Sequence, residues 1–206
     1  MPRSEKLTAG VRSAPARSGA RQAWRGGASP PTRVAAFTVV ELVVALAIAA
    51  LLANIAVPAF HDWLAGYELA NHARHLAESM TRARTEAIRR GHRVNLCKSA
   101  DRQHCADQGR WDAGFVVFVD VNHDGRIDAD EPLLGIEGRA PNGITIEANR
   151  PLDDYVSYTS LGHARMLNGA LQMGTFTLCR SGQRALRVVL ANSGRVRTER
   201  TGIPCP

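Results

Sequence analysis

The stretch from residue 39 to residue 57 constrains the fold most strongly, because it is apolar except for Glu41 and Asn54. Its length is about that needed to cross the hydrocarbon core of a bilayer as a helix. A lone carboxylate is costly in lipid and by default marks a functional site. We therefore predict a membrane-spanning helix over residues 37–58, with Glu41 as a functional residue near its start.

The residues before this helix form a basic segment with little that can pack. Residues 1–36 contain seven Lys or Arg and one Glu, among many Ser, Gly, Ala and Pro. This composition is typical of a disordered or removed leader. Removing a segment of charge +6 from a chain of charge +7 leaves +1, so the basic character of the whole chain comes from the leader. No cleavage site of the ordinary secretory type follows the apolar stretch.

After Pro58 the pattern becomes that of an amphipathic helix over residues 59–91. Apolar residues recur at steps of three and four and predict one buried stripe (Leu69, Ala73, Leu76, Met80, Ala83 and Ala87). Gly91 is a natural end for such a helix. We expect one continuous helix from Phe37 to Arg90, bent at Pro58 because proline lacks an amide donor.

From Arg93 onward, short segments rich in β-branched and aromatic residues alternate with turn residues, which predicts strands. We expect them at residues 93–98, 115–121, 133–138, 144–148, 155–158, 175–179, 186–191 and 195–201. Strands and helices do not alternate along the chain, so the strands should pair antiparallel. The predicted fold class is α+β, with a long N-terminal helix packed on an antiparallel β-sheet domain over residues 92–206.

Four cysteines, Cys97, Cys105, Cys179 and Cys205, allow three disulfide pairings. A domain exported across a membrane reaches an oxidising compartment, which favours disulfides over free thiols. Proximity in the sequence favours Cys97–Cys105 and Cys179–Cys205. A zinc site that includes His104 is the alternative, but the spacing matches no zinc template.

The start of the apolar stretch resembles that of a type IV prepilin. The matching residues are a small residue at Ala36, then Phe37 and Thr38, with Glu41 at the fifth place counted from Phe37 and Pro58 at the twenty-second. The family pattern has glycine before the cleaved bond, where this chain has Ala36. The resemblance implies that a prepilin peptidase removes the leader after Ala36 and that the same enzyme methylates the new Phe37 amine.

Later features narrow this resemblance to the GspH/FimT group of minor pilins and pseudopilins. They are VNLCKS at residues 94–99, Trp111, GFVVFVDVNHDG at 114–125, FTLC at 176–179, SGRVR at 193–197 and the final cysteine. The resemblance implies a single pass through the inner membrane of a Gram-negative-type bacterium and a periplasmic globular domain. It also implies assembly with other pilins into a pilus or pseudopilus.

In this family context Glu41 has an expected partner. A carboxylate in apolar surroundings needs a cation. The resemblance supplies the Phe37 amine of a neighbouring subunit, so we expect Glu41 to act in subunit assembly. The alternative is a glutamate at the membrane edge that reaches the lipid headgroups.

A cluster of arginines near the C-terminus is the main candidate for binding. Residues 180–200 contain a single acid, Glu199, and six arginines (Arg180, Arg184, Arg187, Arg195, Arg197 and Arg200). In a strand Arg195 and Arg197 project to the same face, and Gly194 permits a tight turn just before them. Some FimT-like members take up DNA through a GRxR motif, which residues 194–197 match.

These features predict guanidinium contacts to DNA phosphates, with little sequence preference and strong salt dependence. No aromatic residue is interleaved with the arginines, so base stacking is not expected. The alternative interpretation is a solvated basic face with local ion pairs. In that case the protein is a structural minor pseudopilin of a type II secretion system, GspH-like, or a pilus-priming subunit without DNA affinity.

The segment Asp120–Glu131 matches the calcium-loop pattern D-x-[DN]-x-[DN]-G-x5-E. The pattern would supply oxygen ligands from Asp120, Asn122, Asp124, Asp128, Glu131 and the Arg126 carbonyl. However, strands rather than helices are expected on both sides, Pro132 follows directly, and Asx-rich turns produce such patterns without metal. We therefore expect no cofactor, with a Ca²⁺-stabilised adhesin as the alternative.

No catalytic constellation is evident in the sequence. His61, His72, His75 and His92 lie on or just after the helix, where His72 and His75 should face solvent or a neighbouring subunit. No serine or thiol has a motif partner, and the central acids crowd into one turn. We predict that the protein is not an enzyme.

Overall fold

The computed structural model describes residues 38–206. The predicted leader and the proposed processing residues Ala36 and Phe37 lie outside the described residues. By its internal contacts the chain divides after Val44 into two units, and the second unit, residues 45–206, contains the folded domain and most of the helix.

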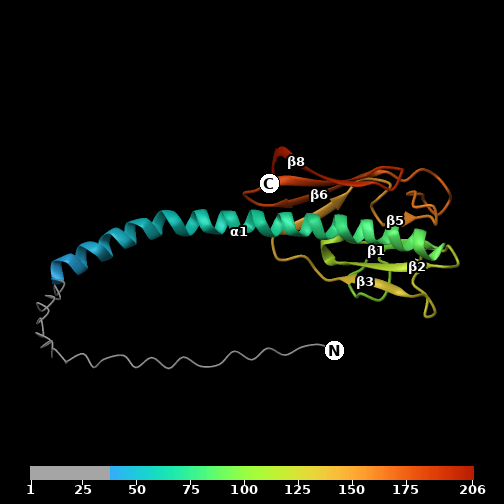
Figure 1. The fold of residues 1–206 in the computed structure, drawn as a ribbon, viewed down its shortest axis with the longest axis horizontal. Helices are drawn as coiled ribbons and strands as arrows, with labels where there is room; N and C mark the ends of the chain where they lie inside the picture. Colours follow the sequence, from blue (N-terminus) through green and yellow to red (C-terminus); the bar gives the residue numbers. More distant parts are fainter. Residues whose placement is uncertain (1–37) are drawn as a thin grey trace, which may run out of the picture. The chain divides into compact units, whose positions relative to one another are not determined.

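Helix α1 spans Val39–Arg90 and contains 52 residues (Figure 1). Pro58 lies within it and removes one amide donor without ending the helix. The helix ends at Gly91. This residue has a φ of 69°, which glycine can adopt without strain, and its amide donates to the Ala87 carbonyl at 3.0 Å. The predicted continuous helix with its end at Gly91 is confirmed.

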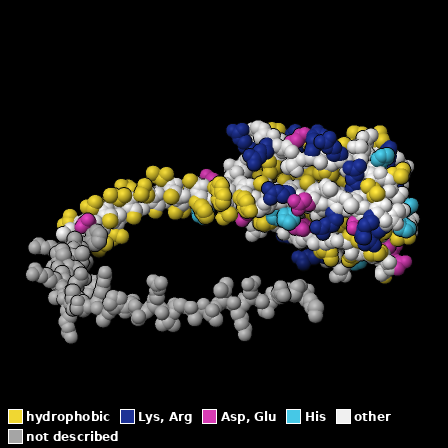
Figure 2. Space-filling view, viewed as in Figure 1, with side chains coloured by type: hydrophobic (Ala, Val, Ile, Leu, Met, Phe, Trp, Pro, Cys, Tyr) yellow, Lys and Arg dark blue, Asp and Glu magenta, His cyan; other side chains and the backbone are white. Residues whose placement is uncertain are grey.

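The first part of α1 carries an apolar surface that no other part of the described chain covers. Every side chain from residue 45 to residue 64 is exposed, although most are aliphatic or aromatic. Figure 2 shows this surface as hydrophobic along the helix. Among the described helices, α1 is long and apolar enough to cross a membrane. It is therefore consistent with the single-pass anchor of a pilin.

After α1, the described chain forms two antiparallel sheets of four strands. The first has the order β3-β2-β1-β5 and contains β1 (Arg93–Lys98), β2 (Phe115–Asp120), β3 (Leu133–Glu137) and β5 (Tyr155–Tyr158). The second has the order β4-β6-β7-β8 and contains β4 (Ile144–Ala148), β6 (Gly174–Arg180), β7 (Arg184–Leu190) and β8 (Val196–Pro204). The antiparallel α+β class is confirmed and each predicted strand is present, but the strands divide between two sheets rather than forming one.

One hydrophobic core joins α1 to both sheets. The predicted stripe on α1 is buried in it, and none of its members is more than 1% exposed (Leu69, Ala73, Leu76, Met80, Ala83 and Ala87). Leu96 and Val156 enter this core from the first sheet, and Phe176 and Val188 enter it from the second. In the view of Figure 1, α1 has β6 and β8 of the second sheet on one side and β1, β2 and β3 of the first sheet on the other. The helix therefore positions the strands that carry the candidate site.

Trp111 connects the two sheets inside this core. It opens the short helix η1 (Trp111–Ala113), and its ring meets Phe176 of β6 edge-on at a centroid distance of 5.0 Å. Phe115 of β2 lies on another side, 6.1 Å away. The indole Nε1 donates to the carbonyls of Leu152 and Asp153 at 3.1 and 2.9 Å, so the buried polar group is satisfied.

Both predicted disulfides are present in the structure. Cys97 is bonded to Cys105, eight residues away, and Cys179 to Cys205, 26 residues away. The second bond ties the C-terminus to β6, and the Cys205 amide also donates to the Gln183 carbonyl at 2.9 Å. The pairing leaves no cysteine of the described chain free for the alternative zinc site.

His72 was predicted to face solvent or a neighbouring subunit, and it is less exposed than His75. It is half-buried and lines a small cavity with Glu137 and Trp111, whereas His75 is exposed as expected. Burial lowers the pKa of His72, and the nearby Glu137 carboxylate opposes that change. The partial burial of His72 arises because Glu137 of β3 and Trp111 lie beside this part of the helix.

Candidate nucleic-acid interface

The arginine pair predicted to bind DNA lies where β8 begins, with Arg195 directly before the strand and Arg197 as its second residue, and β8 is an edge strand of the second sheet. β7 and β8 form an antiparallel hairpin, and two backbone hydrogen bonds close its turn. The Gly194 amide donates to the Ala191 carbonyl at 2.8 Å, and the Ala191 amide donates to the Arg195 carbonyl at 2.9 Å. These bonds of the turn therefore fix the position of the Arg195 backbone next to β8.

Two features of this turn require glycine at position 194. The residue has a φ of +80°, which is strained for any residue with a Cβ. It is also buried against the neighbouring turn, so that a Cβ would overlap the Gly162 carbonyl oxygen and approach Arg84 Nε at 3.1 Å. The glycine of the GRVR motif thus holds the hairpin against the rest of the domain.

Arg195 and Arg197 point away from the core. Val196 between them is half-buried and packs on the core, as strand alternation requires. Arg197 Nε donates to Glu199 Oε1 at 2.6 Å, and the strand register places Glu199 opposite Arg187 of β7. We call these four residues the hairpin face. Three arginines and one glutamate give it a net charge of +2.

The other three arginines lie on the opposite side of the sheet, which corrects the prediction of a single cluster. The register places Arg180 opposite Ile144 and Arg200 opposite Leu186, and both partners are core residues. Arg180 donates to Glu68 of α1 and forms an ion pair with it. Arg180 therefore fastens β6 to the helix and does not contribute to a free basic surface.

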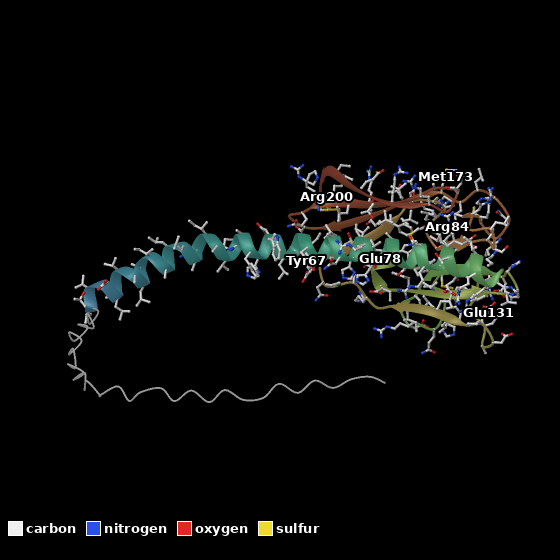
Figure 3. All side chains as sticks on the ribbon, viewed as in Figure 1. Tyr67, Glu78, Arg84, Glu131, Met173 and Arg200 are labelled. Carbon is white, nitrogen blue, oxygen red and sulfur yellow. A yellow bond between two sulfur atoms is a disulfide. The ribbon has the colours of Figure 1, made fainter. Side chains whose placement is uncertain are left out.

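Arg184 and Arg200 line a groove of about 700 Å³ between α1 and the ends of β7 and β8. Arg74, Trp63 and Tyr67 of α1 also line it, and the two aromatic rings stack at a centroid distance of 5.8 Å. Figure 3 shows Tyr67 and Arg200 at the same end of the domain. No aromatic residue is interleaved with the arginines in the sequence, but the fold brings Trp63 and Tyr67 of α1 beside Arg184 and Arg200.

Several arginines retain their full capacity to bind an anion. Within residues 38–206, no acidic side chain forms an ion pair with Arg184, Arg187, Arg195 or Arg200. Figure 2 shows basic side chains gathered over the end of the domain where β8 lies. Guanidinium groups in such positions can bind phosphate or carboxylate oxygens through two parallel hydrogen bonds.

The predicted assembly residue Glu41 lies in the first turn of α1, where the helix dipole favours a negative charge. Its amide donates to Thr38 Oγ1 at 3.2 Å, but no donor within residues 38–206 bonds its carboxylate. By contrast, Asn54 Nδ2 donates to the Ala50 carbonyl at 2.8 Å. Of these two polar side chains, only that of Asn54 has a hydrogen-bond partner within residues 38–206.

The candidate calcium loop connects β2 to β3. In Figure 3, Glu131 of this loop and Arg200, which lines the groove beside α1, lie at opposite ends of the globular part. Within residues 38–206, no three Asp, Glu, His or Cys side chains form a preassembled metal cluster. The loop is therefore separate from the groove that Arg184 and Arg200 line.

Comparisons with known proteins agree with this architecture. A model of the family described as type II transport protein GspH matches residues 72–194, more than half of the chain. Curated protein sequences show no significant match. The crystal structure of the type IV minor pilin FimU from Pseudomonas aeruginosa matches with a TM-score of 0.52 and 18% identity, over 66% of this chain and 95% of that chain.

A second solved structure comes from a secretion system rather than a pilus. The minor pseudopilin EpsH of the Vibrio cholerae type 2 secretion system matches with a TM-score of 0.45 and 14% identity, over 66% of this chain and 98% of that chain. The likeness to FimU establishes the fold, and the family model establishes the membership. The chain belongs to the GspH family and is a GspH/FimT-like minor pilin or pseudopilin.

Proposed function

We propose that this chain is a minor subunit of a type IV pilus that contacts DNA phosphates through the hairpin face during DNA uptake. The observation that carries the proposal is Arg195, which is exposed beside Arg197 and has no acidic partner within residues 38–206. Arg187 adds a third guanidinium across the hairpin. Guanidinium forks arranged in this way suit the oxygens of a nucleic-acid backbone and carry no base specificity.

The groove with Arg184 and Arg200 suits a different environment. Trp63 is six residues after Val57, the end of the apolar stretch, and therefore lies about 9 Å beyond it along the helix. Tryptophan and tyrosine at this distance from a membrane-spanning segment lie at the level of the lipid headgroups. We therefore assign the groove to the membrane surface, and to neighbouring subunits after assembly, and assign DNA to the hairpin face.

The salt dependence of DNA binding tests the proposal. With three phosphate contacts, the Kd of the full-length chain in nonionic detergent for a 30-base-pair duplex should rise about fortyfold between 50 and 200 mM salt. Arg195→Gln with Arg197→Gln should weaken binding at least tenfold at about 50 mM salt and leave only about a fourfold rise, because one contact remains. Fluorescence anisotropy gives both quantities.

Arg126→Gln with Arg139→Gln is the matched control, since both residues are exposed and the change in charge is the same. This variant should bind as the wild type does. Equal losses in the two double variants would show that only net charge matters, and unchanged binding without Arg195 and Arg197 would refute the assignment.

A purely structural role is the second candidate, and one observation favours it. Two of the six predicted arginines are already neutralised, Arg180 by Glu68 and Arg197 by Glu199. Local ion pairing is what a solvated basic face without a ligand would show. A GspH-like pseudopilin or a priming pilin with this surface should have no measurable DNA affinity even at about 50 mM salt.

We also propose that Glu41 pairs with the Phe37 amine of a neighbouring subunit once prepilin peptidase has removed the leader. An unpaired carboxylate in apolar surroundings is strongly unfavourable, and an amine would neutralise it. Glu41→Gln should therefore lower recovery of the chain in sheared filaments at least tenfold while its amount in the membrane stays constant. Asn54→Ala is the control, because the Asn54 side chain bonds its own helix; equal recovery of Glu41→Gln would contradict the pairing.

A further inference from the structure

The loop between β2 and β3 brings the two ends of the Asp120–Glu131 segment together. β2 and β3 pair antiparallel, with Phe118 opposite Leu133, and the Val119 amide donates to the Pro132 carbonyl at 3.1 Å. The β2–β3 hairpin therefore holds the two ends of the loop, as the two flanking helices do in an EF-hand. It places the first and last oxygen ligands of the pattern side by side.

Two carboxylates of this loop are buried without a cation. Asp120 is fully buried and Glu131 is only 7% exposed. Within residues 38–206, neither forms an ion pair with Lys, Arg or His. A buried charge is strongly unfavourable unless it is paired or coordinates a metal. The segment of twelve residues carries five acids and Arg126, a net charge of −4. The loop thus has an excess of negative charge, and a divalent cation would halve it.

Within residues 38–206, one oxygen of Asp120 has no hydrogen-bond partner. Its Oδ2 accepts hydrogen bonds from Asn95 Nδ2 at 2.5 Å and from the Gly125 amide at 3.2 Å, so the carboxylate is directed into the loop. Its Oδ1 is buried, and no group of the described chain donates a hydrogen bond to it. A buried, unsatisfied carboxylate oxygen is rare in folded proteins and calls for an unseen donor or ion.

The remaining side chains of the pattern form hydrogen bonds to the backbone of the loop. Asn122 Oδ1 accepts from the Asp124 amide at 3.0 Å, and Asp124 Oδ1 accepts from the Arg126 amide at 2.7 Å. Glu131 Oε1 accepts from the Val121 amide at 2.7 Å. A carboxylate or amide oxygen has two lone pairs, so each of these oxygens retains one that can bind a cation.

Gly125 provides the turn at the centre of the loop. Its φ is +76°, and a Cβ at this position would collide with the side chain of Leu167. The sixth position of the pattern therefore favours glycine for its conformation, whereas the end of the flexible Leu167 side chain could move aside. This is the position at which the calcium-loop pattern also requires glycine for a sharp turn.

We propose that this loop binds one Ca²⁺ ion. The ligands are the oxygens of Asp120, Asn122, Asp124, Asp128 and Glu131 with the Arg126 carbonyl, and Asp128 must exchange its present hydrogen bond to Asn122 Nδ2 for the ion. An all-oxygen set of this number on a flexible loop suits Ca²⁺ better than Mg²⁺, which requires a rigid octahedron. Binding neutralises the two buried carboxylates and fixes the β2–β3 hairpin.

The melting temperature of the full-length chain in nonionic detergent tests this proposal. After treatment with EGTA, CaCl₂ at a hundredfold excess over Kd should raise Tm by about 5 to 10 °C. Isothermal titration with CaCl₂ should give one site per chain, and MgCl₂ at the same concentration should produce a much smaller shift. Ion binding outside the loop would give the same shift in every variant of the loop.

Glu131→Gln is the main variant, and Asp130→Asn is its control. Both remove one negative charge from adjacent positions, but Asp130 is exposed and is not a ligand in the pattern. Glu131→Gln should abolish the Ca²⁺ shift and Asp130→Asn should retain it. Because Glu131 is buried, the exposed ligand variant Asp124→Ala provides a second test should Glu131→Gln fail to fold. A Tm of the wild type that does not differ between EGTA and 10 mM CaCl₂ overturns the proposal, as does an equal shift in Asp124→Ala.

Discussion

Replacing Gly194 by alanine is expected to lower the free energy of unfolding by about 3 kcal/mol or more. A Cβ at a φ of +80° costs about 1–2 kcal/mol through contact with its own backbone. The same Cβ overlaps the carbonyl oxygen of Gly162, which belongs to a packed turn and cannot move without shifting it. Such overpacking typically costs a further 1–3 kcal/mol. Guanidinium denaturation of the full-length chain in detergent measures the loss.

Gly182→Ala is the matched control for this prediction. Gly182 lies in the β6–β7 turn with a φ of +78°, but a Cβ there would meet no atom within 4 Å. The free energy of unfolding of this variant should fall only by the cost of the backbone conformation, about 1–2 kcal/mol. Similar losses in the two variants would show that the approach of Gly194 to Gly162 is unimportant.

This comparison also separates two roles within the GRVR motif. Gly194 is buried and acts through the fold, whereas Arg195 and Arg197 are exposed and are the residues proposed to meet DNA. A loss of DNA binding in a Gly194 variant would therefore report a displaced hairpin. Only the arginine variants, which leave the turn intact, test the contact itself.

Removing the Cys179–Cys205 disulfide should have the second large effect, a loss of about 3.5 kcal/mol of stability. The bond closes a loop of 26 residues, and the entropy that it removes from the unfolded chain grows with loop length. It also fastens the end of β8, so the double variant Cys179→Ser with Cys205→Ser should expose the C-terminus to limited proteolysis. Denaturation midpoints of oxidised samples give the stability difference.

The Cys97–Cys105 pair provides the comparison, because its loop is only eight residues long. Its double serine variant should lose about 2.5 kcal/mol by the same loop-closure argument. The C-terminus should remain protected in this variant. A greater loss for the shorter loop would mean that contacts in the folded state, rather than chain entropy, determine the contribution of each bond.

The sequence predicts α1 and the strands because local patterns determine them. The three- and four-residue steps from Leu69 to Ala87 allow only one apolar face on a helix, and that face is the buried one. Gly91 ends the helix because a left-handed residue is needed there. Strand positions and disulfide pairs likewise depend on residues that are close in sequence.

The division of the strands between two sheets, and of the arginines between two faces, depends on contacts far apart in the chain. From the sequence pattern alone, Arg180 would be predicted to be a solvent-exposed basic residue. Only the packing of β6 beside α1 brings it to Glu68. Trp63 and Tyr67 share a helix face by their spacing, but the sequence does not reveal that Arg184 and Arg200 lie opposite them.

The Asp120–Glu131 loop depends both on local sequence and on contacts between distant parts of the chain. The sequence alone determined the spacing of its oxygen groups and the glycine at its centre, because both belong to one short segment. It also argued against a metal, since no helices flank the segment. Only the tertiary structure placed the loop on a hairpin that joins its ends and buried Asp120 and Glu131 without a cation. The desolvation of a charge depends on everything packed around it, and that packing is a property of the whole fold.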